Sequence, residues 1–369
     1  MAAFSDRIEP QQIAREECVS AGAAQAGPWD AFSPARRWLF LFVLFLAGVS
    51  STMDRGVMSI VLEQLKQEFA LSDTMLGLLG GAPFGICYAL SSIPLARVAD
   101  RHGRKRVLFW AALGWAIMTG LCGLATTLPF LILARMGVGL AEGGSTAPSH
   151  ALIADYFPPI RRAMALAVLT ASGTLGTLLA SSVGGWVTQN HGWRQAFFVM
   201  AAISLPIAFL VLSVLREPRR TAPGAASPPF RQDLAALARK PAFVSVLTGL
   251  LFFTAMPFAV IIFTPAFLIR DMGLSATQAG SLFGLATATG TVFGSLAGGY
   301  VADRLRRMDD AWLLRLPAIL MAVECPVTLA QFSQSGLWPF LVLHSISTAL
   351  LYAVLPSCFA TVQYVCGGG

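Results

Sequence analysis

Two long apolar stretches of the sequence each contain a pair of charged residues, although ionised side chains are rare in such stretches. These residues are Asp54 and Arg55 in one stretch and Arg135 and Glu142 in another. An ion at the centre of a bilayer costs roughly 2.5 to 3.5 kcal/mol by insertion scales, so such residues are seldom retained without a use. Carboxyl groups bind and release protons, and a guanidinium group can hold an anion at two points. The sequence therefore predicts a site for a proton and an anion, without covalent chemistry.

The spacing of these residues indicates how they could meet. Arg135 and Glu142 are seven residues apart, which places them on one helix face, about 10 Å apart in depth. Asp54 and Arg55 are adjacent and do not face each other, so we expect partners from two different helices. An anion that displaced Arg55 or Arg135 from Asp54 or Glu142 would release a carboxyl group to take up a proton. The alternative is that these residues form static pairs that hold the helices together.

The composition shows what surrounds these charges. Hydrophobic residues make up 56% of the chain, charged residues only 12%, and the mean hydropathy is +0.67, which indicates a membrane protein. The net charge of +7 comes from short basic segments between apolar runs, a pattern typical of orientation signals rather than of nucleic-acid binding. No metal-ligand spacing, nucleophile-base set or phosphate-binding loop is present in the sequence. We therefore expect neither an enzyme nor a bound metal or cofactor, with a proton gradient as the energy source.

Ten apolar stretches are long enough, at about 1.5 Å per residue, to cross a hydrocarbon core of roughly 30 Å. They cover residues 38–62, 75–95, 107–127, 130–152, 163–188, 195–215, 243–269, 277–299, 311–333 and 337–361. The predicted domains are a disordered cytoplasmic arm (1–35), an amino-terminal six-helix bundle (36–216), a cytoplasmic linker (217–241) and a carboxyl-terminal bundle (242–369).

The distribution of basic residues predicts the orientation. If alternate loops are assigned to two sides, one side receives only Lys66, Arg194 and Arg270, and the other receives all the basic clusters. This asymmetry predicts a multi-pass protein with a cytoplasmic amino terminus. The composition is compatible with a bacterial inner membrane.

One charged loop occurs twice in the same register. The residues 98–101 reappear as 301–304, an offset of 203, which indicates an internal duplication. An even number of crossings separates the copies, so the repeats are parallel. The same offset carries the four charged positions onto Pro257, Phe258, Trp338 and Ser345. The polar site therefore belongs to the first half.

The loop from Ala96 to Arg106 resembles the signature of the major facilitator superfamily, Gly-x-x-x-Asp-Arg-x-Gly-Arg-Lys-Arg, with Ala96 in place of the first Gly. The resemblance implies an all-α membrane protein of two parallel repeats. In this chain the first repeat has six predicted spans and the second repeat only four. A complete second repeat would need two further helices, which the offset of 203 places beyond the end of the chain. The resemblance also implies a cytoplasmic gate, in which the Asp of each copy of the loop docks on the start of a helix in the other half. The gating residues are Asp100, Arg101, Gly103, Arg104, Asp303 and Arg304.

Two consequences follow for the gate. A carboxylate such as Asp100 is favoured at a helix start by about 0.3 to 1 kcal/mol, but its implied partner begins the eleventh helix, which this chain does not contain. The partner of Asp303 would lie near Ala163. The alternative is that the basic residues of the loop only fix the topology and contact lipid head groups.

Three further segments narrow the resemblance. Residues 53–55, Met-Asp-Arg, and the segments 139–148 and 153–157 are similar to the spinster-like branch of the superfamily. That resemblance implies a proton-linked carrier of lysophospholipids or sphingoid phosphates, with Asp54, Arg55 and Glu142 as the matching residues. Sugar-acid and aromatic-acid carriers of the superfamily also have a charged first span, so those substrates stay open.

The expected function is thus secondary active transport of an amphipathic or small organic anion by alternating access. We expect the carrier to act as a monomer in contact with membrane lipids. The alternative is a non-transporting sensor or an inactive remnant of such a carrier. Glu324, in the ninth span, has no clear partner, and His150 and His344 look isolated. Small residues repeat every four positions in spans five and eight and predict close helix packing there: Gly176, Ala180 and Gly184, and Gly290, Gly294 and Gly298.

Overall fold

The computed structural model describes residues 28–217, 244, 248, 260–306, 308–309 and 311–367, and the elements in this part are helices, with no strand. A short 3-10 helix, η1 (Pro28–Ala31), precedes α2. The α-helices of the first half are α2 (Pro34–Phe69), α3 (Asp73–His102), α4 (Arg104–Gly123), α5 (Leu128–Glu142), α6 (Thr146–Tyr156), α7 (Pro159–His191) and α8 (Trp193–Val214). Those of the second half are α11 (Ala276–Arg306), α12 (Trp312–Phe332) and α13 (Leu337–Gly367).

Eight of the described helices are long and apolar enough to cross a membrane, and a shorter apolar helix covers Val260–Arg270. This confirms the predicted all-α membrane fold. The predicted linker at 217–241 and most of the amino-terminal arm lie outside the described residues, so those two assignments stay predictions.

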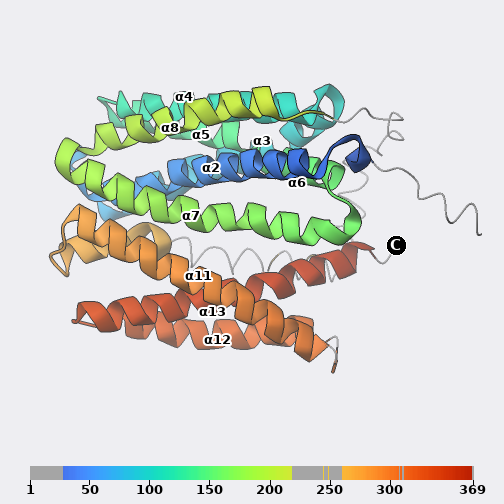
Figure 1. Ribbon diagram of the computed structural model, residues 1–369. Coiled ribbons are helices and arrows are strands. Elements are labelled where there is room, and N and C mark those ends of the chain that lie inside the picture. Colours follow the sequence, from blue (N-terminus) through green and yellow to red (C-terminus); the bar gives the residue numbers. More distant parts are fainter. Residues whose placement is uncertain are drawn as a thin grey trace, which may run out of the picture.

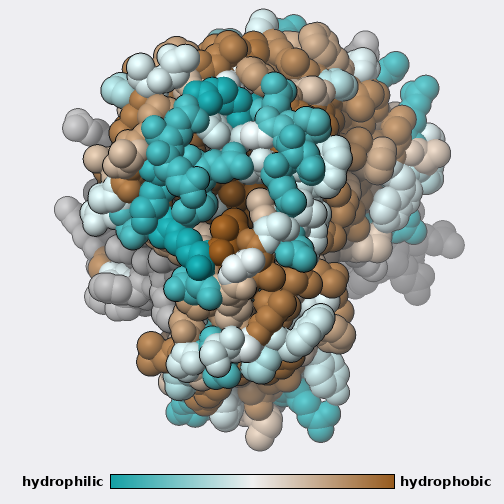
Figure 2. All heavy atoms as spheres, turned by 90° about the vertical axis from the view of Figure 1, so that its left-hand side faces the viewer, coloured by the Kyte–Doolittle hydropathy of each residue, from teal (hydrophilic) through white to brown (hydrophobic). Residues whose placement is uncertain are grey.

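The helices run side by side in two groups (Figure 1). Helices α2 to α8 form the first group and α11 to α13 the second, with α7 and α11 in contact at the boundary. We call the end of the bundle that carries residues 100–104 the motif end. The opposite end carries the turns between α2 and α3 and between α7 and α8. Figure 2 views the opposite end and shows hydrophilic side chains gathered on it, whereas the flanks are largely hydrophobic.

Large apolar side chains lie on the flanks of the bundle as well as in its core. Exposed examples are Leu90, Trp110 and Phe293, which are 69%, 66% and 71% accessible. In the core, Leu44, Val61 and Trp115 of the first half are fully buried. Exposed apolar surface on this scale needs an apolar solvent. The hydrocarbon of a bilayer provides it.

The predicted fourth span, 130–152, is divided into two helices. Helix α5 ends at Glu142 and α6 begins at Thr146, with a turn at residues 143–145. Gly143 and Gly144 favour a break here, and Pro148 cannot donate a backbone hydrogen bond. Ser145 completes the turn, because its N–H and its hydroxyl both donate to the Glu142 carbonyl oxygen, at 3.0 and 2.7 Å. The turn therefore lies directly after a predicted site residue.

The repeated small residues bring helices into close contact, as predicted. A Cβ atom added to Gly176 would lie 2.6 Å from Thr52 Cβ on α2, and one added to Gly294 would lie 2.2 Å from the Ala349 carbonyl oxygen on α13. Both distances are far below van der Waals contact. Helix α7 thus depends on Gly176 to approach α2, and α11 depends on Gly294 to approach α13.

Replacing Gly294 by Ala is expected to destabilise the second half. The added methyl group would force α11 from α13, and overpacking of this kind costs about 1 to 3 kcal/mol. Gly299 is the matched control on the same helix, because nothing lies within 4 Å of a Cβ added there. Gly299→Ala should be neutral or stabilising by up to about 1 kcal/mol, since Ala is the better helix former. Thermal melting of the purified variants in detergent checks this, and equal melting temperatures would contradict the assigned packing.

Candidate functional site

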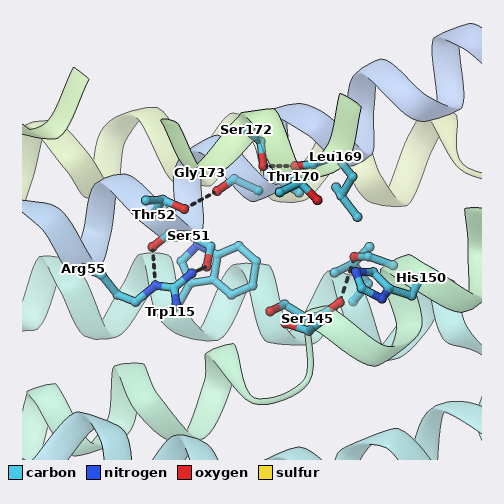
Figure 3. A pocket seen from close by; sticks show the side chains of 15 residues that line it. Ser51, Thr52, Arg55, Trp115, Ser145, His150, Leu169, Thr170, Ser172 and Gly173 are labelled. Carbon is cyan, nitrogen blue, oxygen red and sulfur yellow. Dashed lines mark hydrogen bonds between the residues drawn. The ribbon is translucent and has the colours of Figure 1, made fainter. Parts of the chain in front are cut away.

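A pocket of about 180 Å³ lies in the first half, between α2, α4, α6 and α7. Figure 3 shows Arg55 at one end of this pocket and His150 toward the other end. Arg55 lies beside the Trp115 ring. The lining is rich in hydroxyl groups, from both the α2 and α7 sides and from the turn before α6. The residues that supply them are Ser51, Thr52, Ser145, Thr146, Ser149, Thr170 and Ser172. Such a lining can form many hydrogen bonds to one small polar molecule.

Glu142 lies directly behind the wall of this pocket. Its side chain is completely buried, and its Oε2 atom is 3.1 Å from Nε of Arg55, whose side chain is 40% exposed. The Ser51 hydroxyl donates to the same oxygen at 2.9 Å, and it also accepts from the Arg55 guanidinium at 3.1 Å. Oε1 of Glu142 has no hydrogen-bond partner among the described residues. The structure therefore brings Arg55 and Glu142 together across α2 and α5, with only Arg55 reaching into the pocket.

Asp54 is also fully buried, but it has a different environment. Its carboxylate accepts from the Ser204 hydroxyl of α8, at 3.2 and 3.4 Å. Ser204 in turn accepts from Ser50 at 2.7 Å, and the indole N–H of Trp115 donates to Ser50 at 3.2 Å. A chain of hydrogen bonds thus joins Asp54 to a ring in the pocket wall.

Arg135 does not form the ion pair that the sequence suggested for it. Its guanidinium donates to the backbone carbonyl of Asp54 at 3.2 Å, and no carboxylate among the described residues lies within salt-bridge distance of it. The carboxylate of Glu142 is paired with Arg55 instead. The Phe84 ring faces both cations, with its centroid 5.9 Å from the Arg55 guanidinium and 5.4 Å from that of Arg135. An aromatic face attracts cations and helps to offset their burial.

Phe84 was not predicted from the sequence, because a lone aromatic residue in an apolar helix gives no signal. Its position depends on Gly139, which the sequence places on the same helix face as Arg135 and Glu142. A Cβ atom added to Gly139 would lie 2.3 Å from the Phe84 carbonyl oxygen. The absence of a side chain at 139 thus lets α3 approach α5 at the depth of the charges.

The charged loop is organised around Arg104 rather than Asp100. The Arg104 guanidinium pairs with Asp155 at 2.5 Å and with Asp100 at 3.6 Å, and its backbone N–H donates to Glu217 at 2.6 Å. Gly103 separates α3 from α4 with φ of +105°, a conformation that L side chains rarely adopt. The carboxylate at the start of α4 is therefore that of Glu217, which the sequence did not single out.

The other gating residues are only partly described. The side chains of Arg101 and Arg304 are exposed, with Arg304 in the last turn of α11. The side chains of Asp303 and Ala163 lie outside the described part of the structure. Docking of the second-copy Asp on the start of α7 therefore stays a prediction.

At the opposite end, charged groups join the two halves. Arg270, which ends the short helix before α11, pairs with both Glu63 of α2 and Asp73 of α3. Lys66 contributes a second cation to Asp73, at 2.8 Å. Close packing of α7 against α11 continues this contact, because a Cβ added to Gly280 would lie 2.0 Å from the Ser181 carbonyl oxygen. The halves are therefore held together at this end of the bundle.

Within the described residues, no group of three or more His, Cys, Asp or Glu side chains could hold a metal ion. The chemistry that this arrangement supports is proton binding by Asp54 and Glu142 and anion binding by Arg55.

Comparisons with known proteins identify the family of this chain and several relatives. A family model described as Major Facilitator Superfamily matches residues 44–367. An MFS-type efflux pump of Mycolicibacterium smegmatis is 36% identical over 339 residues, which cover 90% of this chain and 78% of that protein. An Escherichia coli protein named "Probable galactarate/D-glucarate transporter" is 26% identical over 321 residues, covering 78% of this chain and 71% of its own. A bacterial homologue of the human lysosomal transporter Spinster, in an inward-facing and unoccupied conformation, superposes with a TM-score of 0.79 at 28% identity, covering 90% of this chain and 76% of that structure.

Proposed function

The chain belongs to the major facilitator superfamily and is a multi-pass membrane transporter of small molecules, and from this premise we propose that it moves a small organic anion together with protons. The proposed location is a bacterial plasma membrane, with the motif end in the cytoplasm, as the distribution of basic residues favours. The proposed carrier acts as a monomer and needs no cofactor, because the proton gradient supplies the energy.

One observation carries this proposal: hydrogen bonds link both buried carboxyl groups to the pocket wall, directly for Glu142 and through intervening side chains for Asp54. Glu142 bonds to Arg55 and Ser51, and Asp54 is reached from Trp115 through two serine hydroxyls. A group in the pocket can therefore change the hydrogen bonds of a carboxyl group that it does not touch.

The coupling step in the proposed cycle is an exchange of partners on Arg55. An incoming anion accepts from the guanidinium in place of Glu142, because the planar fork of Arg suits a carboxylate or phosphate. The buried Glu142 carboxylate has then lost its cation, and an unpaired charge in a low-dielectric site is strongly disfavoured. It binds a proton instead. When the anion leaves, Glu142 returns to Arg55 and releases the proton.

The pocket favours a small hydroxylated acid as the substrate. Its volume of about 180 Å³ is small compared with typical ligand pockets of roughly 300 to 1,000 Å³, and seven hydroxyl-bearing residues line it. The similarity to a protein named as a galactarate/D-glucarate transporter supports the same class. A lysolipid-like anion is the second candidate, favoured by the likeness to a bacterial Spinster homologue. For such a ligand, only the anionic head group would enter the pocket.

Proton flux into sealed proteoliposomes tests the function. The purified chain is reconstituted with a pH-sensitive dye inside, and candidate anions are added outside: D-glucarate, galactarate, an aromatic acid and a lysophosphatidic acid. We expect D-glucarate or galactarate to drive acidification above that of protein-free vesicles. Acidification by the lysolipid alone would select the second candidate. A correctly inserted chain that gives no flux with any gradient in either direction would instead support a sensor or an inactive carrier.

A further inference from the structure

A second buried polar cluster lies in the other half of the protein, away from the pocket. Glu324, on the interior of α12, is 1% exposed. The hydroxyl oxygens of Thr328 and of Ser347, on α13, lie 2.5 and 3.0 Å from its Oε1 atom. The two hydroxyl oxygens are themselves 2.9 Å apart. Glu324 therefore has partners, which the sequence alone did not reveal, and three oxygens form a closed triangle.

Counting protons shows which form of Glu324 fits this triangle. Three hydrogen-bonded edges need three protons, and the two hydroxyl groups supply two. With an ionised carboxylate, both hydroxyls point at Oε1 and no proton remains for the contact between Thr328 and Ser347. A proton on Oε1 supplies the third bond, so that each oxygen donates once around the ring.

The surroundings also favour the neutral carboxyl group. Oε2 of Glu324 has no hydrogen-bond partner among the described residues, and no basic side chain there forms an ion pair with it. A buried carboxylate without a cation and with one oxygen unpaired is costly by several kcal/mol. The cationic residues on the described helices α11, α12 and α13 are Arg304, Arg306 and Arg315, which lie near the helix ends at the motif end. Two other titratable groups lie on α13: His344 contacts Gln331, and Tyr352 interacts with Thr291 of α11 and with Arg55 of α2.

A polar stripe leads from this cluster toward the opposite end of the bundle. Gln331 lies two turns beyond Glu324, in the last turn of α12, and its Nε2 is 3.2 Å from Nδ1 of His344. The other ring nitrogen of His344 is 3.0 Å from the Thr287 hydroxyl of α11. His344 is one turn from Ser347 on α13, so these polar groups lie next to the triangle along the same helix. Oε1 of Gln331 is buried and unpartnered.

We propose that Glu324, Thr328 and Ser347 form a proton-binding site in the second half, which exchanges its proton with the solution at the opposite end through Gln331 and His344. The occupant is one proton, bound to Oε1 of Glu324 and donated to a hydroxyl group of the triangle. This site is separate from the pocket and stands whether or not the pocket carries an anion. It gives the second half, which has no counterpart of the four charges in α2 and α5, an ionisable group of its own.

Infrared spectroscopy of the full chain in lipid vesicles tests this proposal. At neutral pH, the wild-type spectrum should contain the carbonyl band of a protonated carboxyl group, and Glu324→Gln should remove its share of that band. Glu142→Gln serves as the control, because the part of the carbonyl band that Glu324 contributes should remain in the spectrum of that variant. Gln can replace the protonated acid in the triangle, since its N–H supplies the third donor, so a normal melting temperature is expected.

Two further measurements sharpen the test. Thr328→Val with Ser347→Ala should shift the Glu324 band, because its hydrogen bonds are lost, and Gln331→Leu should slow the shift that follows transfer into heavy water. A band identical in wild type and Glu324→Gln, or unmoved by loss of both hydroxyls, would overturn the proton site. Removal of the band by sodium ions would assign the cluster to sodium rather than to a proton, and would also overturn it.

Discussion

Replacing Glu142 by Gln is expected to abolish accumulation of substrate against its gradient while leaving exchange of substrate across the membrane intact. Gln has nearly the same shape but carries no charge in either state, so it cannot compete with the anion for Arg55 or carry the coupled proton. In the wild type, deprotonated Glu142 occupies Arg55. Anion affinity should therefore fall as the pH rises, and in Glu142→Gln it should be independent of pH.

Uptake into proteoliposomes with an imposed pH gradient, compared with counterflow without one, checks this expectation. Glu68→Gln is the matched control, because Glu68 pairs with Arg194 at the opposite end through similar chemistry. Its driven uptake should equal that of the wild type. Driven accumulation that survives in Glu142→Gln would remove Glu142 from the coupling step and leave Asp54 as the proton carrier.

Substitutions of Arg55 are expected to have the second large effect. Arg55→Lys keeps a positive charge near Glu142 but loses the planar fork, so one charged hydrogen bond to the anion disappears. Such a bond is worth about 1.5 to 3 kcal/mol, which corresponds to about tenfold to hundredfold weaker binding. Arg55→Met removes the cation entirely and should leave no specific binding. The effect should appear mainly in the KM of the lysine variant.

Initial uptake rates over a range of anion concentrations separate KM from kcat in these variants. Arg194→Lys is the control, because Arg194 also forms a forked pair, with Glu68, but far from the pocket. It should leave the KM unchanged. If Arg55→Lys binds the anion as tightly as the wild type, the proposed two-point contact is wrong, and the ion pair with Glu142 is structural.

The fold was largely predictable because its signals are local. Apolar stretches of sufficient length mark the spans, and the repeated Asp-Arg loop marks the duplication. The break after Glu142 was missed, because Gly143 and Gly144 occur in a stretch that is apolar on both sides and gives no change of composition. The four charged residues were identifiable for the same local reason, since an ion in an apolar run stands out.

The partners of these charges were not predictable, because they depend on which helices adjoin and at what depth. The sequence suggested carboxylate partners for both Arg55 and Arg135, but Arg135 bonds to a backbone carbonyl and faces Phe84. Glu217 at the start of α4 and the hydroxyl partners of Glu324 were missed as well. Residues of ordinary type become functional candidates only when a neighbouring helix places them beside a charge.

The contact of Arg270 with Glu63 and Asp73 has a consequence for the working cycle. All three side chains are at least partly exposed to solvent, with accessibilities of 27%, 16% and 61%. Salt screens the attraction between exposed charges, and it removes most of this attraction once they are farther apart than a Debye length of about 8 Å at physiological ionic strength. If alternating access separates the halves at that end, dissolved electrolyte there lowers the barrier to opening, whereas electrolyte on the other face of the membrane leaves it unchanged. The turnover of this protein would then respond to the salinity of one compartment only.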